Sequence, residues 1–135
     1  MDLVVILKAL SDENRLRILN LLRNERLCVG ELETVLNMTQ SNVSRHLIKL
    51  RNIEMITQQK KAQWVYYQIN HSFKKRHPIL LEFLYKELDK MAQCKKDLDN
   101  LSNYKQKLNP ELENALIENI NNISSQVNQT GIIPT

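Results

Sequence analysis

The sequence predicts a mainly helical α+β fold, and three observations support that prediction. The 135 residues contain only two glycines, too few for a sheet-rich fold with many tight turns. Apolar residues recur at helical spacing along most of the chain. One stretch, residues 54–70, changes to a period of two, which is typical of strands. The length suits one compact domain, expected over residues 1–106, followed by an amphipathic helix and a frayed tail over residues 107–135.

Four short helices are expected in the first half of the chain. Ser11-Asp12-Glu13 provides an N-cap and an acidic first turn for the second helix. Thr39 is the expected N-cap of the fourth helix, whose apolar stripe consists of Val43, Leu47 and Leu50. The expected helices cover residues 2–10, 13–24, 29–36 and 39–52.

The second half is expected to contain a β-hairpin and two further helices. The strands are residues 54–60 and 64–70, with Lys60-Lys61-Ala62-Gln63 at the turn. Pro78 is suited to the first turn of a long fifth helix that ends at Asn109-Pro110. Its apolar stripe is longer than a small core needs, which indicates pairing with another helix. That stripe consists of Leu81, Leu84, Leu88, Met91 and Leu98, and the stripe of the last helix of Leu112, Leu116, Ile120, Ile123 and Val127.

Charge is distributed unevenly along the chain. The net charge is +4, but residues 109–135 hold three acidic side chains and no Lys or Arg, so residues 1–108 carry +7. A basic body favours an anionic partner, nucleic acid first, although many solvated surfaces are equally basic. The N-terminal apolar run is too short for a signal peptide, and no stretch is long enough for a membrane helix. We therefore expect a cytoplasmic location and two reduced cysteines.

The order of the elements is that of a winged helix-turn-helix, α-α-α-α-β-β-α with an extra C-terminal helix. With the apolar stripe of the fourth helix inward, its polar residues lie on the opposite face and can contact DNA bases and phosphates. The alternative is a solvated face, and the order of elements favours DNA. The predicted DNA-binding residues are Gln40, Ser41, Ser44, Arg45 and Lys49 in this helix, and Lys60, Lys61 and Gln63 at the hairpin tip.

Three aromatic residues, Trp64, Tyr66 and Tyr67, crowd the second strand of the hairpin. They could stack on nucleic-acid bases. Their alternation with Val65 and Ile69 favours core packing instead.

KALSDENRLRILNLL, LCVGEL, TQSNVSRHLIKLRN and QWVYYQI occur in this order, and together they closely resemble the ArsR/SmtB family of winged-helix repressors. The resemblance runs from about Val4 to about Leu101. It implies a homodimer built from the first and fifth helices, binding to an inverted-repeat operator, and release when a metal or metalloid binds. By position it assigns DNA reading to Gln40, Ser41, Ser44 and Arg45. For His46, a structural hydrogen bond is at least as plausible as a base contact.

The chain departs from the family pattern at two places. The family wing usually turns through a glycine, where this chain has Ala62. Arsenic-type members typically read Cys-Val-Cys at the third helix, and this chain reads Cys28-Val29-Gly30. One subunit therefore offers at most Cys28 and Cys94 as thiolate ligands. That pair would suit a species needing two thiolates, such as methylarsenite, better than arsenite or a soft divalent metal.

Cys28 lies at a helix start, where the macrodipole is expected to lower the pKa of its thiol. Each cysteine could instead be a buried apolar filler, or the two could form a regulatory disulfide. No cofactor is expected to be needed for folding. A zinc site in the fifth helix, as other family members have, is not expected because no histidine follows His77.

Catalysis finds no support in the sequence, since it contains no Gly-rich phosphate loop, His-Glu-x-x-His motif or nucleophile signature. The prediction is a homodimeric DNA-binding repressor, released by a thiol-binding metalloid or soft metal. The alternatives are a repressor that senses no metal, a redox-responsive repressor and, least favoured, a protein-interaction adaptor.

Overall fold

The computed structural model describes residues 2–129, except for the side chains of 109–113 and 128–129. The chain divides into two compact units, with the boundary between Leu101 and Ser102. We call residues 2–101 the body and residues 102–129 the C-terminal segment. The predicted division between residues 106 and 107 stays a prediction.

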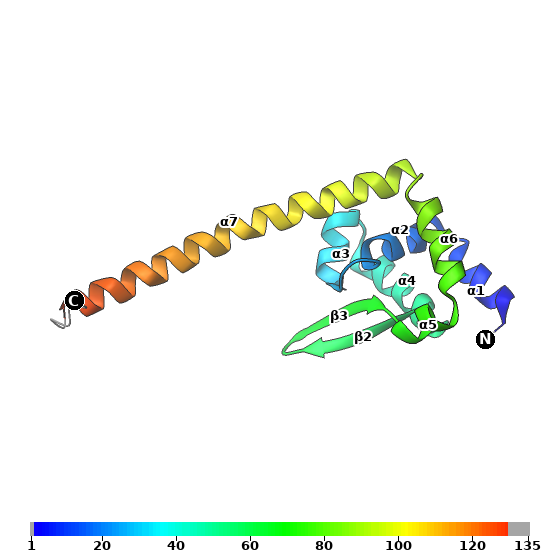
Figure 1. Cartoon of the computed structure of the whole chain (residues 1–135), viewed down its shortest axis with the longest axis horizontal. Coiled ribbons are helices and arrows are strands. Elements are labelled where there is room, and N and C mark those ends of the chain that lie inside the picture. Colours follow the sequence, from blue (N-terminus) through cyan, green and yellow to red (C-terminus); the bar gives the residue numbers. More distant parts are fainter. Residues whose placement is uncertain (1, 130–135) are drawn as a thin grey trace. The chain divides into compact units, whose positions relative to one another are not determined.

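The body contains a helical bundle and a small sheet, so the predicted mainly helical α+β class is confirmed (Figure 1). None of the described helices is long and apolar enough to cross a membrane. The elements are α1 (Leu3–Leu10), α2 (Glu13–Leu22), β1 (Leu27–Cys28), α3 (Val29–Leu36), α4 (Gln40–Asn52), β2 (Ile56–Lys61), β3 (Trp64–Ile69), α5 (His71–Arg76), α6 (Pro78–Leu88) and α7 (Ala92–Gln129), the last of which continues into the C-terminal segment.

The predicted N-caps are present. Asp12 accepts a hydrogen bond from the backbone N–H of Arg15 at 3.1 Å, which fixes the start of α2. Thr39 accepts one from the backbone N–H of Asn42 at 3.2 Å, which fixes the start of α4. Each cap satisfies a helix N–H that has no partner within the helix.

The sheet has three antiparallel strands in the order β1-β3-β2. The hairpin was predicted from its period, but the two-residue strand β1 was not, because two residues show no period. Leu27 of β1 pairs with Tyr67, and Lys61 pairs with Trp64 next to the turn. Ala62 there has a φ of 53°, so alanine takes the left-handed conformation that a glycine would favour.

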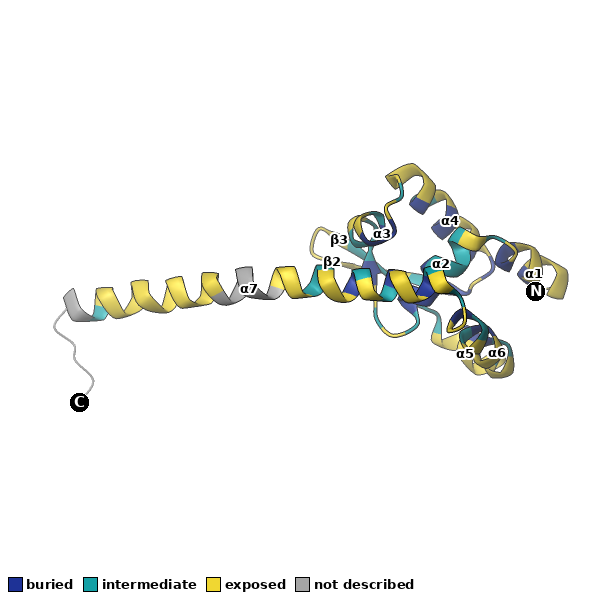
Figure 2. Ribbon diagram, turned by 90° about the horizontal axis from the view of Figure 1, so that it is seen from above, coloured by how far each residue is buried: buried dark blue, intermediate teal, exposed yellow. Residues whose placement is uncertain are grey.

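The core lies between the helices and one side of the sheet (Figure 2). Val43, Leu47 and Leu50 are all at most 1% exposed, which confirms the predicted inward face of α4. Core packing was the wrong prediction for Trp64, which is 54% exposed. Trp64 is the first residue of β3, directly beside the turn of the hairpin.

Helix boundaries after the hairpin differ from the prediction in two ways. Residues 71–76, for which no helix was predicted, form α5, and the Asn70 side chain caps it by accepting from the N–H of Ser72 at 3.0 Å. The predicted fifth helix is interrupted after Leu88, so that α6 and α7 replace it. At this break, Arg23 forms an ion pair with Asp89 at 2.8 Å and donates to the carbonyl of Tyr85 at 3.3 Å.

Asn109-Pro110 was predicted to end a helix, and this prediction was wrong, since α7 runs through it to Gln129. A proline within a helix removes one backbone hydrogen bond. Residues on both sides keep the helical conformation, so the local break is tolerated. Of the predicted stripe in this segment, Leu116, Ile120 and Ile123 are 60–61% exposed, and Leu112 lies outside the described side chains.

A buried ion pair joins α2 to α7 within the body. Asp97 is fully buried and accepts from Arg17 Nε at 2.8 Å and Nη2 at 3.0 Å, and from Gln93 at 2.9 Å. The side-chain hydrogen bond and the charge of Asp97 raise the pKa of Arg17, while burial opposes them. Nearby, Asn20 donates to the carbonyl of Cys94 at 3.1 Å. All the buried polar atoms of this junction are therefore satisfied, as a low-dielectric core requires.

Candidate nucleic-acid interface

Helix α4 has one buried face and one exposed face, which is polar except for Ile48. His46 shares the buried face with the three apolar residues of the stripe and is 4% exposed. Ser44 lies half-buried at the edge between the two faces. The remaining predicted contacts of this helix are exposed: Gln40, Ser41, Arg45 and Lys49. The structure thus brings five of the eight predicted DNA-binding residues together on or beside one helix face.

The turn before α4 is held by the backbone. Asn37 ends α3 in the left-handed conformation, with a φ of 53°, and the N–H of Met38 donates to the carbonyl of Glu33 at 3.2 Å. Asparagine tolerates this conformation better than most residues. Helices α3 and α4 pack against each other through this tight turn, which is the arrangement of a helix-turn-helix.

His46 is buried and contacts other residues of the body, as the structural alternative for this residue expects. Its Nδ1 lies 3.3 Å from Arg15 Nη1 and 4.0 Å from Asp12 Oδ1. Arg15 also donates to the carbonyl of Ala9, so this cluster joins the end of α1, the start of α2 and the inner side of α4. Burial lowers the pKa of His46, and the neighbouring arginines and Lys49 lower it further, against the opposing charge of Asp12. The imidazole is therefore neutral at pH 7.

Asp12 completes the same cluster. Burial alone would raise the pKa of its carboxyl group, but the N–H of Arg15 and the charges of His46 and Arg15 together lower it. A carboxylate therefore remains beside Arg15 at neutral pH, 3.6 Å from its Nη1. The cluster holds α4 against α1 and α2 at the level of its buried histidine.

The hairpin, or wing, carries the other three predicted contacts at its tip. Lys60, Lys61 and Gln63 are all exposed. Arg51 of α4 donates to Gln58 of β2 at 2.8 Å, so the wing is attached to the helix that precedes it. The wing and α4 thus offer two separate sets of polar and basic side chains.

Two further exposed residues of this region are not among the predicted contacts. Trp64 adjoins the basic tip, and base stacking was the less favoured alternative that the sequence left for it. Asn42, in the first turn of α4, is exposed and accepts from Arg45 at 3.3 Å. Its amide can therefore influence how the Arg45 guanidinium is presented.

The two cysteines are free thiols in different settings. Cys28 is half-buried and is the N-cap residue of α3, where its backbone N–H donates to Glu31 at 3.0 Å. The expected lowering of its pKa is wrong: burial raises the pKa of the thiol, and the Glu31 carboxylate adds to this. Cys94 is 1% exposed in α7, and burial together with the charge of Asp97 raises the pKa of its thiol.

A metal site is not preassembled in the part of the chain that the structure describes. No group of three or more His, Cys, Asp or Glu side chains there could hold a metal ion. The donors present at Cys28 and Cys94 are two separate thiols, which fits neither a three-thiolate arsenite site nor a four-ligand zinc site within one subunit.

Comparison with known proteins places the body in a family. Residues 12–58 match the family described as "Bacterial regulatory protein, arsR family". The chain is 42% identical over 82 residues to the transcriptional activator HlyU of Vibrio cholerae, covering 61% of this chain and 76% of HlyU. A structure described as reduced HlyU from the same species superposes with a TM-score of 0.52, at 41% identity, covering 61% of this chain and 86% of that one.

Two further relatives differ in function. The arsenic resistance transcriptional regulator ArsR2 of Pseudomonas putida is 44% identical over 66 residues, which cover 48% of this chain and 57% of the relative. The chain therefore spans a little over half the length of ArsR2. The transcriptional repressor SdpR of Bacillus subtilis is 34% identical over 65 residues, covering 48% of this chain and 72% of SdpR.

The winged helix-turn-helix fold, the exposed polar face of α4 and these relatives lead to one assignment. As the sequence predicted, the protein is a regulator and not an enzyme. The chain belongs to the arsR family of bacterial DNA-binding transcriptional regulators.

Proposed function

We propose that the protein is a homodimeric repressor that acts in the cytoplasm and binds an inverted-repeat operator through α4 and the wing. The observation that carries this proposal is the exposed polar face of α4. Gln40 and Arg45 can make bidentate contacts to adenine and guanine, respectively. The small side chains of Ser41 and Ser44 allow the backbone to approach the groove closely. Lys49, Lys60, Lys61 and Gln63 would contact phosphates or the adjacent groove.

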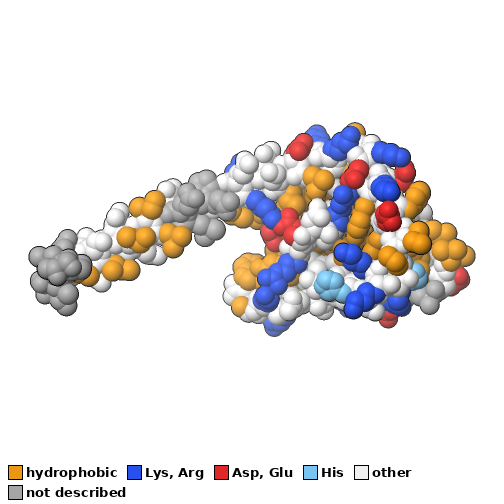
Figure 3. Space-filling model, in the orientation of Figure 1, with side chains coloured by type: hydrophobic (Ala, Val, Ile, Leu, Met, Phe, Trp, Pro, Cys, Tyr) orange, Lys and Arg blue, Asp and Glu red, His pale blue; other side chains and the backbone are white. Residues whose placement is uncertain are grey.

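The dimer is supported by an apolar surface that one subunit leaves uncovered. Helices α1 and α6 expose large apolar side chains at the end of the body where Figure 1 places them, and orange side chains gather there in Figure 3. The members are Leu3, Val4, Val5 and Leu7 of α1, and Ile79 and Phe83 of α6, with exposures between 46% and 80%. Exposed apolar patches of this kind mark interaction sites.

A symmetric pairing of this surface matches the predicted dimer of the first and fifth helices, with α6 as the first part of the predicted fifth helix. Two-fold symmetry would then place the two α4 helices in successive major grooves, about 34 Å apart. The half-sites of the operator would be inverted for the same reason.

Release of DNA is proposed to depend on the thiols. Cys28 is the N-cap of α3, the first helix of the helix-turn-helix, and this position supports an effect of its modification on α4. With two thiols per subunit, within one subunit or across the dimer, methylarsenite is favoured over arsenite and soft divalent metals. ArsR2, an arsenic resistance regulator, supports a metalloid. Oxidation of the same thiols is the second candidate, because both are free and one relative is described in a reduced form.

Fluorescence anisotropy on promoter DNA tests the DNA-binding part. Arg45→Ala should weaken specific binding by about 1–3 kcal/mol, the range of one bidentate base contact. Lys96→Ala is the matched control, since it removes one exposed positive charge from α7, outside the proposed interface. Equal affinity of Arg45→Ala and wild type for the promoter DNA would mean that Arg45 makes no base contact. Absence of any salt-dependent, sequence-specific binding would favour the adaptor.

The same assay tests the inducer. Methylarsenite, arsenite, cadmium, zinc and a thiol oxidant are titrated onto the complex with wild type, Cys28→Ser and Cys94→Ser. Release of wild type but not of Cys28→Ser by methylarsenite supports the metalloid, whereas release by oxidant alone supports the redox candidate. A complex that none of these reagents dissociates would identify a repressor that senses neither.

Gly30 offers a gain-of-function test of the missing thiol. A Cβ built at Gly30 would meet no atom within 4 Å, so Gly30→Cys should fold normally and restore Cys-Val-Cys. Arsenite should then release DNA at lower concentration than it does from wild type. An unchanged response to arsenite would mean that a thiol at position 30 does not contribute to metalloid sensing.

A further inference from the structure

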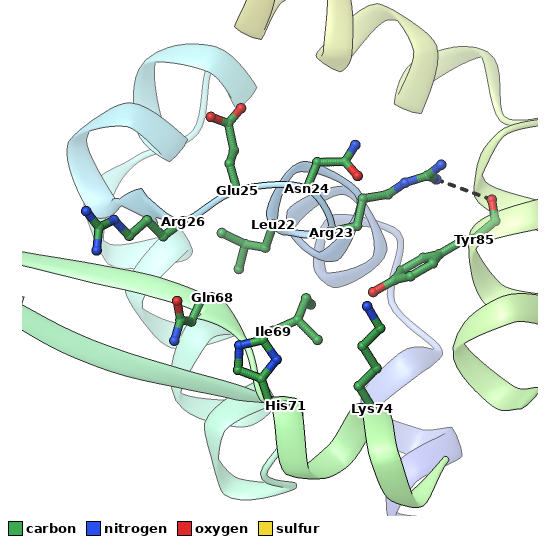
Figure 4. Close-up of a pocket in the computed structure, with 10 residues that line it drawn as sticks. All are labelled: Leu22, Arg23, Asn24, Glu25, Arg26, Gln68, Ile69, His71, Lys74 and Tyr85. Carbon is green, nitrogen blue, oxygen red and sulfur yellow. Dashed lines mark hydrogen bonds between the residues drawn. The ribbon is translucent and has the colours of Figure 1, made fainter. Parts of the chain in front are cut away.

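We propose that the body contains a binding site for a small oxyanion, a carboxylate or phosphate carried by a free metabolite, on the side where α2, β3, α5 and α6 meet. A cavity of about 160 Å³ opens there. Its floor is apolar, with Leu22 and Ile69 among its lining residues (Figure 4). This volume is enough for several water molecules or one small organic acid.

The polar side chains around this cavity are mostly hydrogen-bond donors. Lys74 of α5 and Tyr85 of α6 direct their ammonium and hydroxyl groups toward each other across one side of the cavity, with the imidazole of His71 nearby (Figure 4). Arg23 supplies a guanidinium from the end of α2. Burial raises the pKa of Tyr85, against the charge of Arg23, so its hydroxyl remains a donor at neutral pH.

Arg23 is paired with Asp89 at 2.8 Å, but no ion pair balances the charge of Lys74 within the described part of the chain. Glu25 is the sole acidic residue among its lining residues, and its carboxylate points away from Lys74 in Figure 4. The ammonium of Lys74 has neither an ion pair nor a side-chain hydrogen bond within the described part of the chain. An oxyanion between Lys74 and Tyr85 would accept hydrogen bonds from both, and charge-assisted bonds of this kind are the strong ones.

The cavity is connected to the break between α6 and α7. The Arg23 guanidinium stacks over the Tyr85 ring at 5.0 Å, and it also holds Asp89 and the Tyr85 carbonyl at that break. A bound anion would compete with Asp89 for Arg23 and change how α6 is held against α2. Because α6 carries part of the apolar surface assigned above to the dimer, the anion would act as an effector of operator binding. This last step rests on the proposed function.

Binding is measured without DNA, by calorimetry with inorganic phosphate and with malonate at constant ionic strength. At least one of the two anions should bind saturably to wild type. Lys74→Gln should weaken this binding about tenfold or more, and Tyr85→Phe should weaken it less. Lys75→Gln is the matched control, because Lys75 is an exposed neighbour on α5 that does not line the cavity. Circular dichroism verifies that each variant is folded.

Absence of saturable binding, or an equal loss of affinity in Lys75→Gln and Lys74→Gln, would overturn the site.

A second experiment distinguishes binding of a free anion from binding of a DNA phosphate. Wild type and Lys74→Gln should bind operator DNA equally when no anion is added, and malonate should alter operator affinity of wild type alone. If Lys74→Gln instead weakens operator binding and DNA displaces malonate, the cavity is part of the DNA interface and the metabolite site is wrong. Anion binding measured without DNA stands or falls independently of the proposed repressor function.

Discussion

The body and the C-terminal segment carry the same kind of apolar pattern and use it differently. In the body, Leu19 and Leu47 recur at helical spacing with other apolar residues and are at most 1% exposed. In the C-terminal segment, Leu116, Ile120 and Ile123 recur in the same way and are 60–61% exposed. A helical period therefore predicts a helix in both places, but only the presence of other elements decides whether its apolar face is buried.

Polar groups differ between the two regions as well. The body buries Asn20, His46 and Asp97 and satisfies each of them. Between residues 114 and 127 the C-terminal segment has exposed or half-buried side chains throughout. Substitutions should therefore change the free energy of unfolding strongly in the body and weakly in the segment, and four variants test that difference.

The largest effect is expected for Asp97→Ala. The substitution leaves the half-buried Arg17 guanidinium without its charge partner. Breaking a buried pair typically costs about 3–5 kcal/mol of unfolding free energy. Urea denaturation measures this loss. Asp99→Ala is the matched control, because Asp99 is exposed on the same helix and its loss should change stability by about 0.5 kcal/mol at most. A loss below about 1 kcal/mol for Asp97→Ala would show that the pair contributes little beyond its own desolvation cost.

The Asp97 pair also shows where prediction from sequence reaches its limit. Local signals predicted the caps at Asp12 and Thr39, the inward face of α4 and the hairpin, because each depends on neighbours within a few residues. Arg17 and Asp97 are 80 positions apart, so no local pattern pairs them. The break after Leu88 depends in the same way on Arg23, a residue distant in sequence, and it was missed.

In the candidate site, too, local features were predicted and features that depend on tertiary packing were not. Gln40, Ser41, Arg45 and Lys49 were identified from helix geometry and resemblance, and their exposure follows from the period of α4. The raised pKa of the Cys28 thiol was not predicted, since burial outweighs the helix N-terminus there. The proposed anion-binding cavity could not be predicted from local sequence patterns, because its lining residues come from α2, β3, α5 and α6.

A pH-dependent effect is expected from His46, also in the body. Burial lowers its pKa below the ordinary value of 6.5. Above that value the histidine is neutral in both the folded and the unfolded chain. As the pH falls through 6.5, the unfolded chain binds a proton that the folded protein resists. Stability is therefore lost, and the loss levels off only below the folded-state pKa.

Urea midpoints measured between pH 7.5 and pH 5 should fall for wild type. They should fall less for His46→Gln, and they should fall as in wild type for His71→Gln, in which an exposed histidine is replaced. The lowered pKa of Asp12 acts below its ordinary value of 3.8, outside this range. Equal slopes in wild type and His46→Gln would mean that protonation of His46 does not oppose folding.

A smaller effect of opposite sign is expected at the wing turn. Ala62 adopts a φ of 53°, a conformation that costs an L-residue about 1–2 kcal/mol. Glycine avoids this cost but loses more backbone entropy on folding, by roughly 0.5–1 kcal/mol. Ala62→Gly should therefore stabilise the protein by about 0.5–1 kcal/mol in thermal or urea denaturation.

Ala9→Gly is the comparison for this variant, because the same change in α1 should be destabilising. If Ala62→Gly also destabilises, the left-handed turn is not strained. The hairpin would then gain from alanine through the unfolded state alone.

The smallest effect is expected for Ile120→Ala in the C-terminal segment. A substitution at an exposed site within one subunit should change the unfolding free energy by about 0.5 kcal/mol or less. Leu19→Ala, at a fully buried position of α2, should cost about 2–5 kcal/mol in the same assay. The two variants remove similar amounts of apolar surface, so their ratio measures how much of the pattern is buried. A loss for Ile120→Ala that approaches that of Leu19→Ala and depends on protein concentration would mean that a second copy of the chain covers the segment. The two regions would then differ in which chain buries the stripe and not in whether it is buried.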